Sequence, residues 1–319
     1  MQEYAIGIDV GGTNIKVGLF DRDANLIRSL QSLTDKELEA NEVIDHLAAQ
    51  VRQLMADCGV TAANVRGVGA AFPSFIDYEN GVVVETSNII SLNDLPVRTM
   101  LAERLQMPVW LDNDANAAAL AEHELGAGRG HDDMIYVTIS TGIGGALILN
   151  GKLYRGMHGM AGEVGHMFIS DSTGYPCSCG VTGCVESISS GVHMARYATD
   201  RIKEGMDSRI LDHAGTLSNV DMVAVGRALA SGDSLALEVV NRGAEYLGRM
   251  FHSLNMIFDI NVFVYGGGVI QLGKRFVDRM VACYRHYSLM DLRFPAQFLA
   301  AELGGNAGLI GAALLVPRE

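Results

Sequence analysis

Large apolar side chains recur at every second position near the start of the chain, as in a β-strand. One face of this segment carries four apolar side chains, Tyr4, Ile6, Ile8 and Val10. Gly11 and Gly12 interrupt the pattern before a second apolar run, Ile15–Phe20. A period of two on the first side of the glycine turn, and an apolar run on the second, predict a β-hairpin.

A related arrangement returns in the middle of the chain. The apolar residues between Ile135 and Leu149 are divided by a second glycine-rich turn, Thr141–Gly145. Two such hairpins, each opening one half of the chain, predict two structurally related halves.

Apolar residues recur at helical spacing in several longer segments. The predicted helices are Glu37–Cys58, Asn113–Gly126, Val192–Glu204, Met222–Ala230, Ser234–Phe258 and Ala307–Val316. Short apolar runs predict strands at Val65–Phe72, Pro108–Asp112 and Asn261–Tyr265. Strands interleaved with helices indicate an α/β fold. The segment Gly151–Gly183, rich in Gly, Ser and Cys, is expected to be a long ordered loop, which usually needs a functional or metal-bound reason to exist.

Composition and charge narrow the class of protein. The 319 residues correspond to about two domains. With 49% hydrophobic and 19% charged residues, the chain is not generally disordered. The 24 Lys and Arg against 37 Asp and Glu give a net charge of −13, which disfavours a nucleic-acid or anionic-membrane partner. The sequence shows no apolar run of about 20 residues and no signal-peptide pattern, so we expect a cytoplasmic protein without a membrane partner.

The five cysteines are unevenly distributed. Cys58 and Cys283 stand alone, whereas Cys177, Cys179 and Cys184 fall within eight positions, after His166. One His and three Cys can close a tetrahedral zinc site. The alternative is a core histidine beside three inert thiols, and the sequence favours structural zinc.

Two acidic residues flank these four ligands. Glu163 and Glu186 lie close to them in the sequence, so the metal is expected to stiffen a loop that aims carboxylates at a polyol.

Three glycine turns follow predicted strands and could approach phosphate oxygens through their backbone N–H groups. They are Asp9–Lys16, Thr141–Gly145 and Gly266–Gly268. Each alone could be an ordinary tight turn. Their convergence would form a cradle for a nucleoside triphosphate.

Asp112–Asn116 ends a predicted strand and opens a helix. A carboxylate there can simply cap the helix, but two acids and two amides in five positions exceed what capping needs. Asp114 is the candidate general base, within reach of a substrate hydroxyl that Asn113 positions.

Together these motifs resemble the ROK family (repressors, open reading frames and kinases) over the whole chain. The matching segments are Asp9–Lys16, Asn113–Asn116, Ser140–Gly145, Glu163–His166, Cys177–Glu186 and Tyr265–Gly268. The resemblance implies an actin-like, hexokinase-type fold of two α/β domains around a cleft. We expect a small domain at 1–115, with the 304–319 helix packing back on it, and a large domain at 116–303 that carries the zinc loop and a dimer surface.

The resemblance also implies an activity, the ATP- and Mg²⁺-dependent phosphorylation of a hexose, with structural Zn²⁺. The residue matching Asp114 takes the proton from the sugar hydroxyl. The expected sugar contacts are Ser74, Ser87, Asn88, Asn113, Asp114, Glu163, His166 and Glu186. The expected ATP contacts are Asp9, Gly11, Gly12, Thr13, Asn14, Lys16, Thr141, Gly142, Gly266, Gly267 and Gly268. Asp9 lies near Mg²⁺, and His166 serves both zinc and sugar.

Two segments bear on which sugar is used. Family members often have Pro-Gly in the sugar loop, whereas this chain has Ser74 after Pro73. The segment Thr86–Ile89 also departs from the usual glucokinase sequence.

Glucose, phosphorylated at the 6-hydroxyl, is the leading expectation for the substrate. Kinases of N-acetylmannosamine, N-acetylglucosamine, fructose or allose are the alternatives. A sugar-responsive repressor is disfavoured because the first glycine turn leaves no room for a DNA-binding segment before it. A homodimer or a dimer of dimers is expected.

Overall fold

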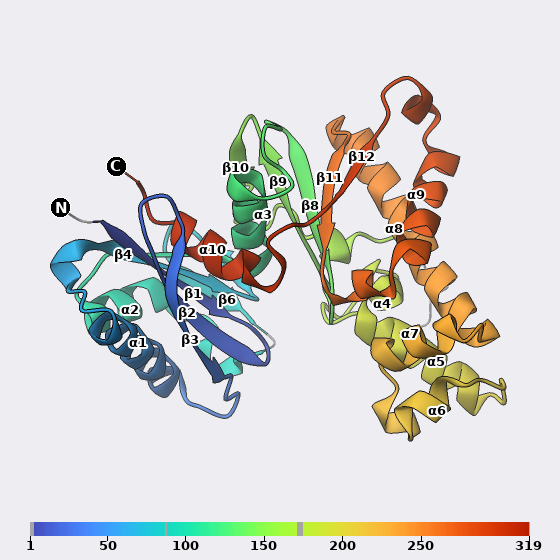
Figure 1. Ribbon diagram of the computed structural model, residues 1–319, viewed down its shortest axis with the longest axis horizontal. Coiled ribbons are helices and arrows are strands. Elements are labelled where there is room, and N and C mark those ends of the chain that lie inside the picture. Colours follow the sequence, from blue (N-terminus) through green and yellow to red (C-terminus); the bar gives the residue numbers. More distant parts are fainter. Residues whose placement is uncertain (1–2, 87, 171–174, 319) are drawn as a thin grey trace. The chain divides into compact units, whose positions relative to one another are not determined.

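The computed structural model describes residues 3–86, 88–170 and 175–318 and has a mixed α/β architecture (Figure 1). Contacts divide the chain into two compact units. Unit 1 comprises residues 1–132, 146–162 and 301–319, and unit 2 comprises residues 133–145 and 163–300. The expected boundary after residue 115 therefore differs from this division, in which the whole of the helix after Asn113 belongs to unit 1.

Unit 1 is built on a five-stranded sheet of order β3-β2-β1-β4-β7. The strands are β1 (Tyr4–Val10), β2 (Asn14–Phe20), β3 (Leu26–Leu33), β4 (Val65–Phe72) and β7 (Val109–Asn113). The first three strands are antiparallel neighbours, and β1, β4 and β7 run parallel. Asp9 pairs with Ala71, which pairs with Asp112, so the carboxyl ends of the three parallel strands lie at one edge of the sheet.

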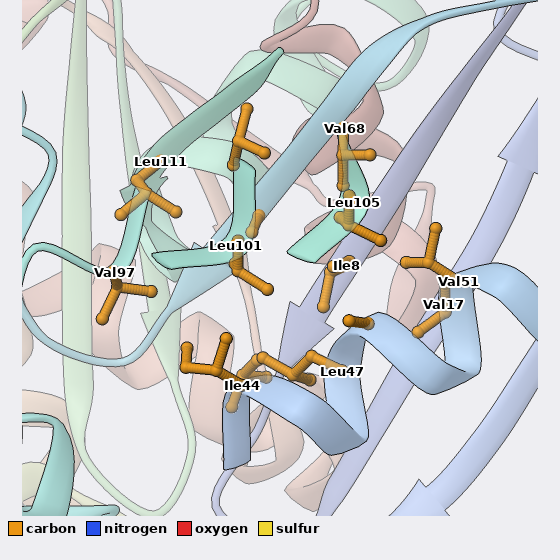
Figure 2. Close-up of a cluster of buried hydrophobic side chains, with 14 of the residues drawn as sticks. Ile8, Val17, Ile44, Leu47, Val51, Val68, Val97, Leu101, Leu105 and Leu111 are labelled. Carbon is orange, nitrogen blue, oxygen red and sulfur yellow. The ribbon is translucent and has the colours of Figure 1, made fainter. Parts of the chain in front are cut away.

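Two helices cover one face of this sheet, α1 (Ala40–Asp57) and α2 (Val97–Leu105). Their apolar side chains interdigitate with those of the strands in a continuous core, in which Ile8, Ile44, Leu47, Leu101 and Leu111 are almost fully buried (Figure 2). Burying such a side chain contributes about 1.5–3 kcal/mol to the stability of the fold. This core therefore stabilises the sheet whose carboxyl edge carries Asp9 and Asp112.

The other face carries α10 (Ala307–Leu314), which also packs on α3 (Asp114–Leu125). Here backbone lies against backbone. A Cβ on Gly69 would stand 1.8 Å from the carbonyl oxygen of Ala312, and one on Gly311 would stand 1.7 Å from that of Ala117. Neither position can hold a side chain, and the close approach fixes both helices relative to the strand ends.

A short hairpin follows β4. Its strands are β5 (Phe75–Asp77) and β6 (Val82–Glu85), which pair antiparallel. The loop between β4 and β5 contains Pro73 and Ser74, the departure from the family pattern noted in the sequence. The hairpin was not expected from the sequence.

The second five-stranded sheet has the order β10-β9-β8-β11-β12. Its strands are β8 (Met134–Ile139), β9 (Ile143–Leu149), β10 (Lys152–Tyr154), β11 (Val262–Gly266) and β12 (Gln297–Ala300). Strand β11 runs parallel to both β8 and β12. Phe251, Phe263, Tyr284 and Phe298 form a cluster of aromatic rings with centroids 5.0–6.0 Å apart, a spacing at which aromatic pairs attract each other beyond area burial.

The helices of unit 2 are α4 (Glu186–Ser189), α5 (Gly191–Lys203), α6 (Ile210–Ala214), α7 (Met222–Ala230), α8 (Ser234–Phe258) and α9 (Lys274–Tyr287). Periodicity predicts α5, α7 and α8, whereas α4, α6 and α9 are not among the predicted helices. The side chains of Asp221 and Asp233 cap the N-termini of α7 and α8 by accepting from the backbone N–H groups of Ala224 and Ala236. Among the described residues, no helix is both long enough and apolar enough to cross a bilayer.

Candidate active site

Asp114 is the first residue of α3, at the carboxyl edge of the unit 1 sheet. Asn113 is the N-cap residue, because its side-chain oxygen accepts from the N–H groups of Ala115 (2.8 Å) and Asn116 (3.2 Å). The capping that the sequence leaves open for Asp114 is therefore carried by its neighbour. The Asp114 carboxylate accepts from the N–H of Ala115 at 2.8 Å.

The surroundings of Asp114 favour its protonated form. Burial is the larger cause and the negative charge of Asp9 the second, and together they raise the pKa of Asp114 to about 7. Burial also raises the pKa of Asp9, against the opposing effect of Lys16. A carboxyl whose pKa lies near neutrality suits a general base, since it can both exist ionised and accept a proton.

Asp9 and Lys16 flank the first glycine turn of unit 1. The N–H of Gly11 donates to the carbonyl of Asn14 at 2.8 Å, which closes the turn between β1 and β2. The Lys16 ammonium donates to the carbonyl of Gly305, just before α10. The carboxylate of Asp9 is an oxygen ligand of the kind that Mg²⁺ prefers, and it lies at the end of a strand close to Asp114.

The predicted sugar loop lies beside Asn113. The Asn113 side-chain N–H donates to the carbonyl of Ser74 at 3.2 Å. Ser74 itself is 7% exposed, and its hydroxyl oxygen has no hydrogen-bond partner among the described residues. Asn88 lies beside the first glycine turn, since a Cβ on Gly12 would stand 3.0 Å from its side-chain oxygen. Ser87 lies outside the described residues.

Unit 2 brings the four predicted zinc ligands together. The ligand atoms of His166, Cys177, Cys179 and Cys184 all lie within 4.8 Å of one another. Sγ of Cys177 is 3.4 Å from Nδ1 of His166, and Sγ of Cys179 is 3.6 Å from Sγ of Cys184. Zn–S bonds of about 2.3 Å in a tetrahedron place sulfur atoms at nearly this separation, so the residues fit zinc.

Burial and the neighbouring thiols raise the pKa of Cys184 to about 12. In the absence of a cation this thiol is therefore held neutral at physiological pH. A metal ion would bind it as a thiolate and displace its proton.

Glu186 joins the cysteine loop to the second glycine turn. One carboxylate oxygen accepts from the Ser178 hydroxyl at 2.9 Å, and the other accepts from the N–H of Ile143 at 2.9 Å. Glu163 directly precedes the short 3₁₀ turn Val164–His166. The carboxylate of Glu186 is thus fixed from both sides within unit 2.

Two of the three glycine turns meet in unit 2. A Cβ on Gly267 would stand 2.3 Å from the carbonyl oxygen of Ile139, so the turn after β11 lies directly against the end of β8. Thr141 and Gly268 line one cavity of about 640 Å³. The third turn, Asp9–Lys16, belongs to unit 1.

The rest of this cavity comes from residues that no motif singled out. Its wall includes the exposed apolar side chains of Val192, Leu217 and Val223 and the polar side chains of Arg196 and Lys203. A cavity of this size is within the range of small-molecule and cofactor sites. In the sequence these residues look like ordinary helix positions, and no signal distinguishes them.

Comparison with known proteins identifies the relatives of this chain. The sequence model of the ROK family matches residues 5–319. The glucokinase of Halalkalibacterium halodurans is 33% identical over 99% of this chain and 96% of its own length. The N-acetylmannosamine kinase of Escherichia fergusonii is 31% identical over 98% of both chains.

A crystal structure of a ROK family glucokinase from Streptomyces griseus, in complex with glucose and AMPPNP, has the same fold. It superimposes with a TM-score of 0.84 at 33% identity, covering 99% of this chain and 100% of that one. The fold expected from the sequence motifs, of the actin-like, hexokinase type, is thereby confirmed. On the evidence of both the sequence match and the fold, the chain belongs to the ROK family.

Proposed function

We propose that the protein is an ATP-dependent hexose kinase that phosphorylates glucose at its 6-hydroxyl. The observation that carries this proposal is the placement of Asp114, a carboxyl at the start of α3 next to the capping side chain of Asn113, with a pKa raised by burial and by Asp9. Asp114 accepts the proton of the sugar hydroxyl as the hydroxyl oxygen attacks the terminal phosphoryl group. The glucokinases and the N-acetylmannosamine kinase among the relatives support a sugar substrate.

Each unit contains residues that are proposed sugar contacts. In unit 1 the proposed contacts are Ser74, Ser87, Asn88 and Asn113, and in unit 2 they are Glu163, His166 and Glu186. Asn113 is well suited because its side chain is fixed by the α3 cap and by the Ser74 carbonyl. A prepositioned hydrogen-bonding group loses little entropy when the substrate binds.

ATP binds through its nucleoside in the unit 2 cavity, whose apolar wall suits a purine base. The proposed phosphate contacts are Gly11, Gly12, Thr13, Asn14, Lys16, Thr141, Gly142, Gly266, Gly267 and Gly268. Asp9 would hold Mg²⁺, which when bound neutralises part of the charge on the phosphates. Lys16 supplies a further positive charge next to Asp9.

Zinc is proposed to be structural, because four protein ligands leave no open coordination position. It would be held by His166, Cys177, Cys179 and Cys184, whose ligand atoms are already gathered. Nδ1 of His166 faces the cysteines, which directs Nε2 of the ring away from the metal. When bound, zinc would hold the ring of His166, a proposed sugar contact, in this orientation.

The ionisation of Asp114 predicts a pH dependence. Only the deprotonated carboxylate can accept the sugar proton, and its pKa is about 7. We therefore expect kcat/KM for the sugar to rise with pH and to level off above pH 7. A rate profile measured from pH 5 to pH 9 at saturating ATP tests this, and a flat profile between pH 5 and pH 7 would contradict it.

Ser74 predicts which sugar is preferred. Its buried hydroxyl has no partner among the described residues, and leaving such a group unpaired costs about 1–3 kcal/mol. This side chain would either donate a hydrogen bond to a ring hydroxyl of glucose or fill space that an N-acetyl group would need. We expect kcat/KM for glucose to exceed that for N-acetylglucosamine and N-acetylmannosamine by at least about tenfold.

The measurement is a coupled ADP-release assay over a panel of hexoses, with two variants as matched controls. Ser74→Gly should narrow the gap between glucose and the N-acetylhexosamines. Ser74→Ala keeps the Cβ and removes only the hydroxyl, so it separates the hydrogen bond from the steric effect. Equal or better use of an N-acetylhexosamine by the unmodified protein would replace glucose with that sugar.

The same panel tests the second candidate function. A kinase of N-acetylmannosamine or N-acetylglucosamine is supported by the N-acetylmannosamine kinase at 31% identity. Fructose and allose belong in the panel as further hexoses. All of these alternatives share the base and the nucleotide site proposed above.

We further propose that the protein forms a homodimer, or a dimer of dimers, through an apolar surface of unit 2. The candidate residues are Met256, Ile257, Leu289, Leu292 and Phe294, at the end of α8 and after α9, which are between 52% and 93% exposed. Burial of such residues against a second copy would remove apolar surface from water. Light scattering measures the mass in solution, and a monomer at micromolar concentration would contradict the proposal.

A further inference from the structure

Arg155 forms an ion pair with a buried carboxylate of unit 1. Its Nε and one of its terminal nitrogens both lie 2.7 Å from the same oxygen, Oδ2 of Asp112. The Asp112 side chain is 2% exposed and that of Arg155 is 25% exposed. A buried carboxylate needs such a partner, because an unpaired charge in the interior is strongly destabilising.

The second oxygen of the same carboxylate binds the start of α3. Oδ1 of Asp112 accepts from the N–H of Asn113 and from the side-chain N–H of Asn116, each at 2.8 Å. These two residues flank Asp114. Asp112 therefore connects Arg155 on one side with the helical turn that carries the proposed base on the other.

The guanidinium of Arg155 also lies over the ring of Tyr78, 4.1 Å from its centroid. Tyr78 directly follows β5, in the hairpin that begins next to Ser74. A second contact joins the same segments, since a Cβ on Gly159 would stand 2.3 Å from the carbonyl oxygen of Ile76. The segment 155–159 thus touches the sugar-loop hairpin as well as Asp112.

We propose that Arg155 is a positioning residue, which sets the placement of the Asp114 carboxylate relative to the sugar loop at Ser74. The inference rests on the proposed hexose kinase function. The planar guanidinium is suited to this task because it donates two hydrogen bonds in its plane while its face stacks on an aromatic ring, which an ammonium cannot do. A misplacement of about 1 Å between base and substrate can cost about 10²-fold in rate.

The test compares Arg155→Gln and Arg155→Lys with the unmodified full-length protein. We expect Arg155→Gln to lower kcat at least about tenfold while KM for ATP stays within about twofold, because the contacts described for Arg155, to Asp112 and Tyr78, involve no proposed ATP residue. Arg155→Lys should recover only part of kcat. A purely structural loss would lower the amount of folded protein and therefore the apparent kcat at an unchanged KM, so kcat is calculated per folded molecule, with the folded fraction measured by circular dichroism and thermal unfolding.

Arg98 provides a matched control. It donates to the carbonyls of Tyr78 (3.2 Å) and Glu79 (2.7 Å), so it holds the same hairpin without touching Asp112. Arg98→Gln should leave kcat within about twofold. In the double variant Asp112→Asn, Arg155→Gln, the loss of kcat, expressed as free energy, should be smaller than the sum of the two single losses, since both residues act through one contact.

The outcomes separate the proposed function from the role of Arg155. If the unmodified protein phosphorylates no hexose, the proposed function fails and the inference falls with it. If it is active and Arg155→Gln keeps kcat within about twofold, the inference is wrong while the kinase function stands. Should Arg155→Gln not fold, Tyr78→Leu and Tyr78→Phe decide, because only leucine removes the ring. A lower kcat for leucine than for phenylalanine supports the inference, and equal values overturn it.

Discussion

Replacing Asp114 with asparagine is expected to lower kcat by about 10²-fold or more while sugar and ATP still bind, because an amide of nearly the same shape cannot accept a proton. The backbone N–H of Ala115 can still donate to the asparagine side-chain oxygen, so the start of α3 keeps its geometry. The loss therefore appears in kcat and not in the dissociation constants. Steady-state ADP release measures the first, and titration calorimetry with sugar and with an ATP analogue measures the second.

The control for this variant is Asp94→Asn, an exposed aspartate of unit 1 with no catalytic assignment. It should retain the turnover of the unmodified protein. Turnover of Asp114→Asn close to that of the unmodified protein would show that another group accepts the proton.

The same substitution should also change stability with pH. Burial raises the pKa of Asp114 to about 7, from its ordinary value of 3.8. The folded protein therefore holds a proton there that the unfolded chain has lost, and this costs stability as the pH rises from about 4 to 7. The asparagine side chain does not titrate and carries no such cost. The melting temperature of Asp114→Asn, relative to that of the unmodified protein, should therefore be higher at pH 8 than at pH 4.

The second large effect concerns the metal. We expect one zinc per chain, and we expect Cys179→Ser to lose it and to lower the melting temperature, because the free energy of binding structural zinc is part of the free energy of folding. Cys179 is exposed while Cys177 and Cys184 are buried. Serine at this position leaves no cavity in the core, so a loss of stability reports on the metal and not on packing.

Elemental analysis and thermal unfolding measure these two quantities. Cys58→Ser is the matched control, since Cys58 is a half-buried free thiol of unit 1 outside the ligand cluster. It should keep the zinc and most of the stability. Protein purified without chelator that contains no stoichiometric metal would contradict the zinc assignment.

Much of the fold follows from periodicity in the sequence. The β1–β2 hairpin is predicted because large apolar residues occupy every second position of β1, and α8 because its long apolar repeat contains no proline. The zinc ligands are also predicted, since the spacing of Cys177, Cys179 and Cys184 is a local property that survives folding. Local patterns of this kind need no knowledge of the tertiary structure.

Strand β3, helix α2 and helix α9 are not among the predicted elements. Strand β3 lies at the edge of its sheet and is largely exposed, so no buried face enforces an alternation of apolar and polar residues. Helix α9 does carry the spacing of an amphipathic helix, with Phe276, Met280 and Tyr284 buried, and this signal was available in the sequence. Helix α2 is short, and its buried residues are too few to define a stripe.

The residues of the candidate site also fall into two groups, those in local sequence motifs and those that only folding brings together. Asp114 and the zinc ligands stand in compact motifs, and the structure keeps each of these groups together. Arg155 is 43 residues from Asp112, and no motif connects them. The apolar wall of the cavity proposed to bind the nucleoside likewise comes from several helices and turns, so only the folded chain reveals it.

The packing of α10 against the bare backbone of Gly69 has a consequence for how the protein is made. Unit 1 contains residues from both the first and the last part of the chain, and Leu309, Ala313 and Val316 complete a small core with Ala5 and Phe20. A nascent chain cannot contribute these late residues until they emerge from the ribosome, after the rest of unit 1 has been synthesised. Until then, the strands next to Asp9 present an uncovered apolar face, which is where chaperones and proteases would recognise an unfinished molecule.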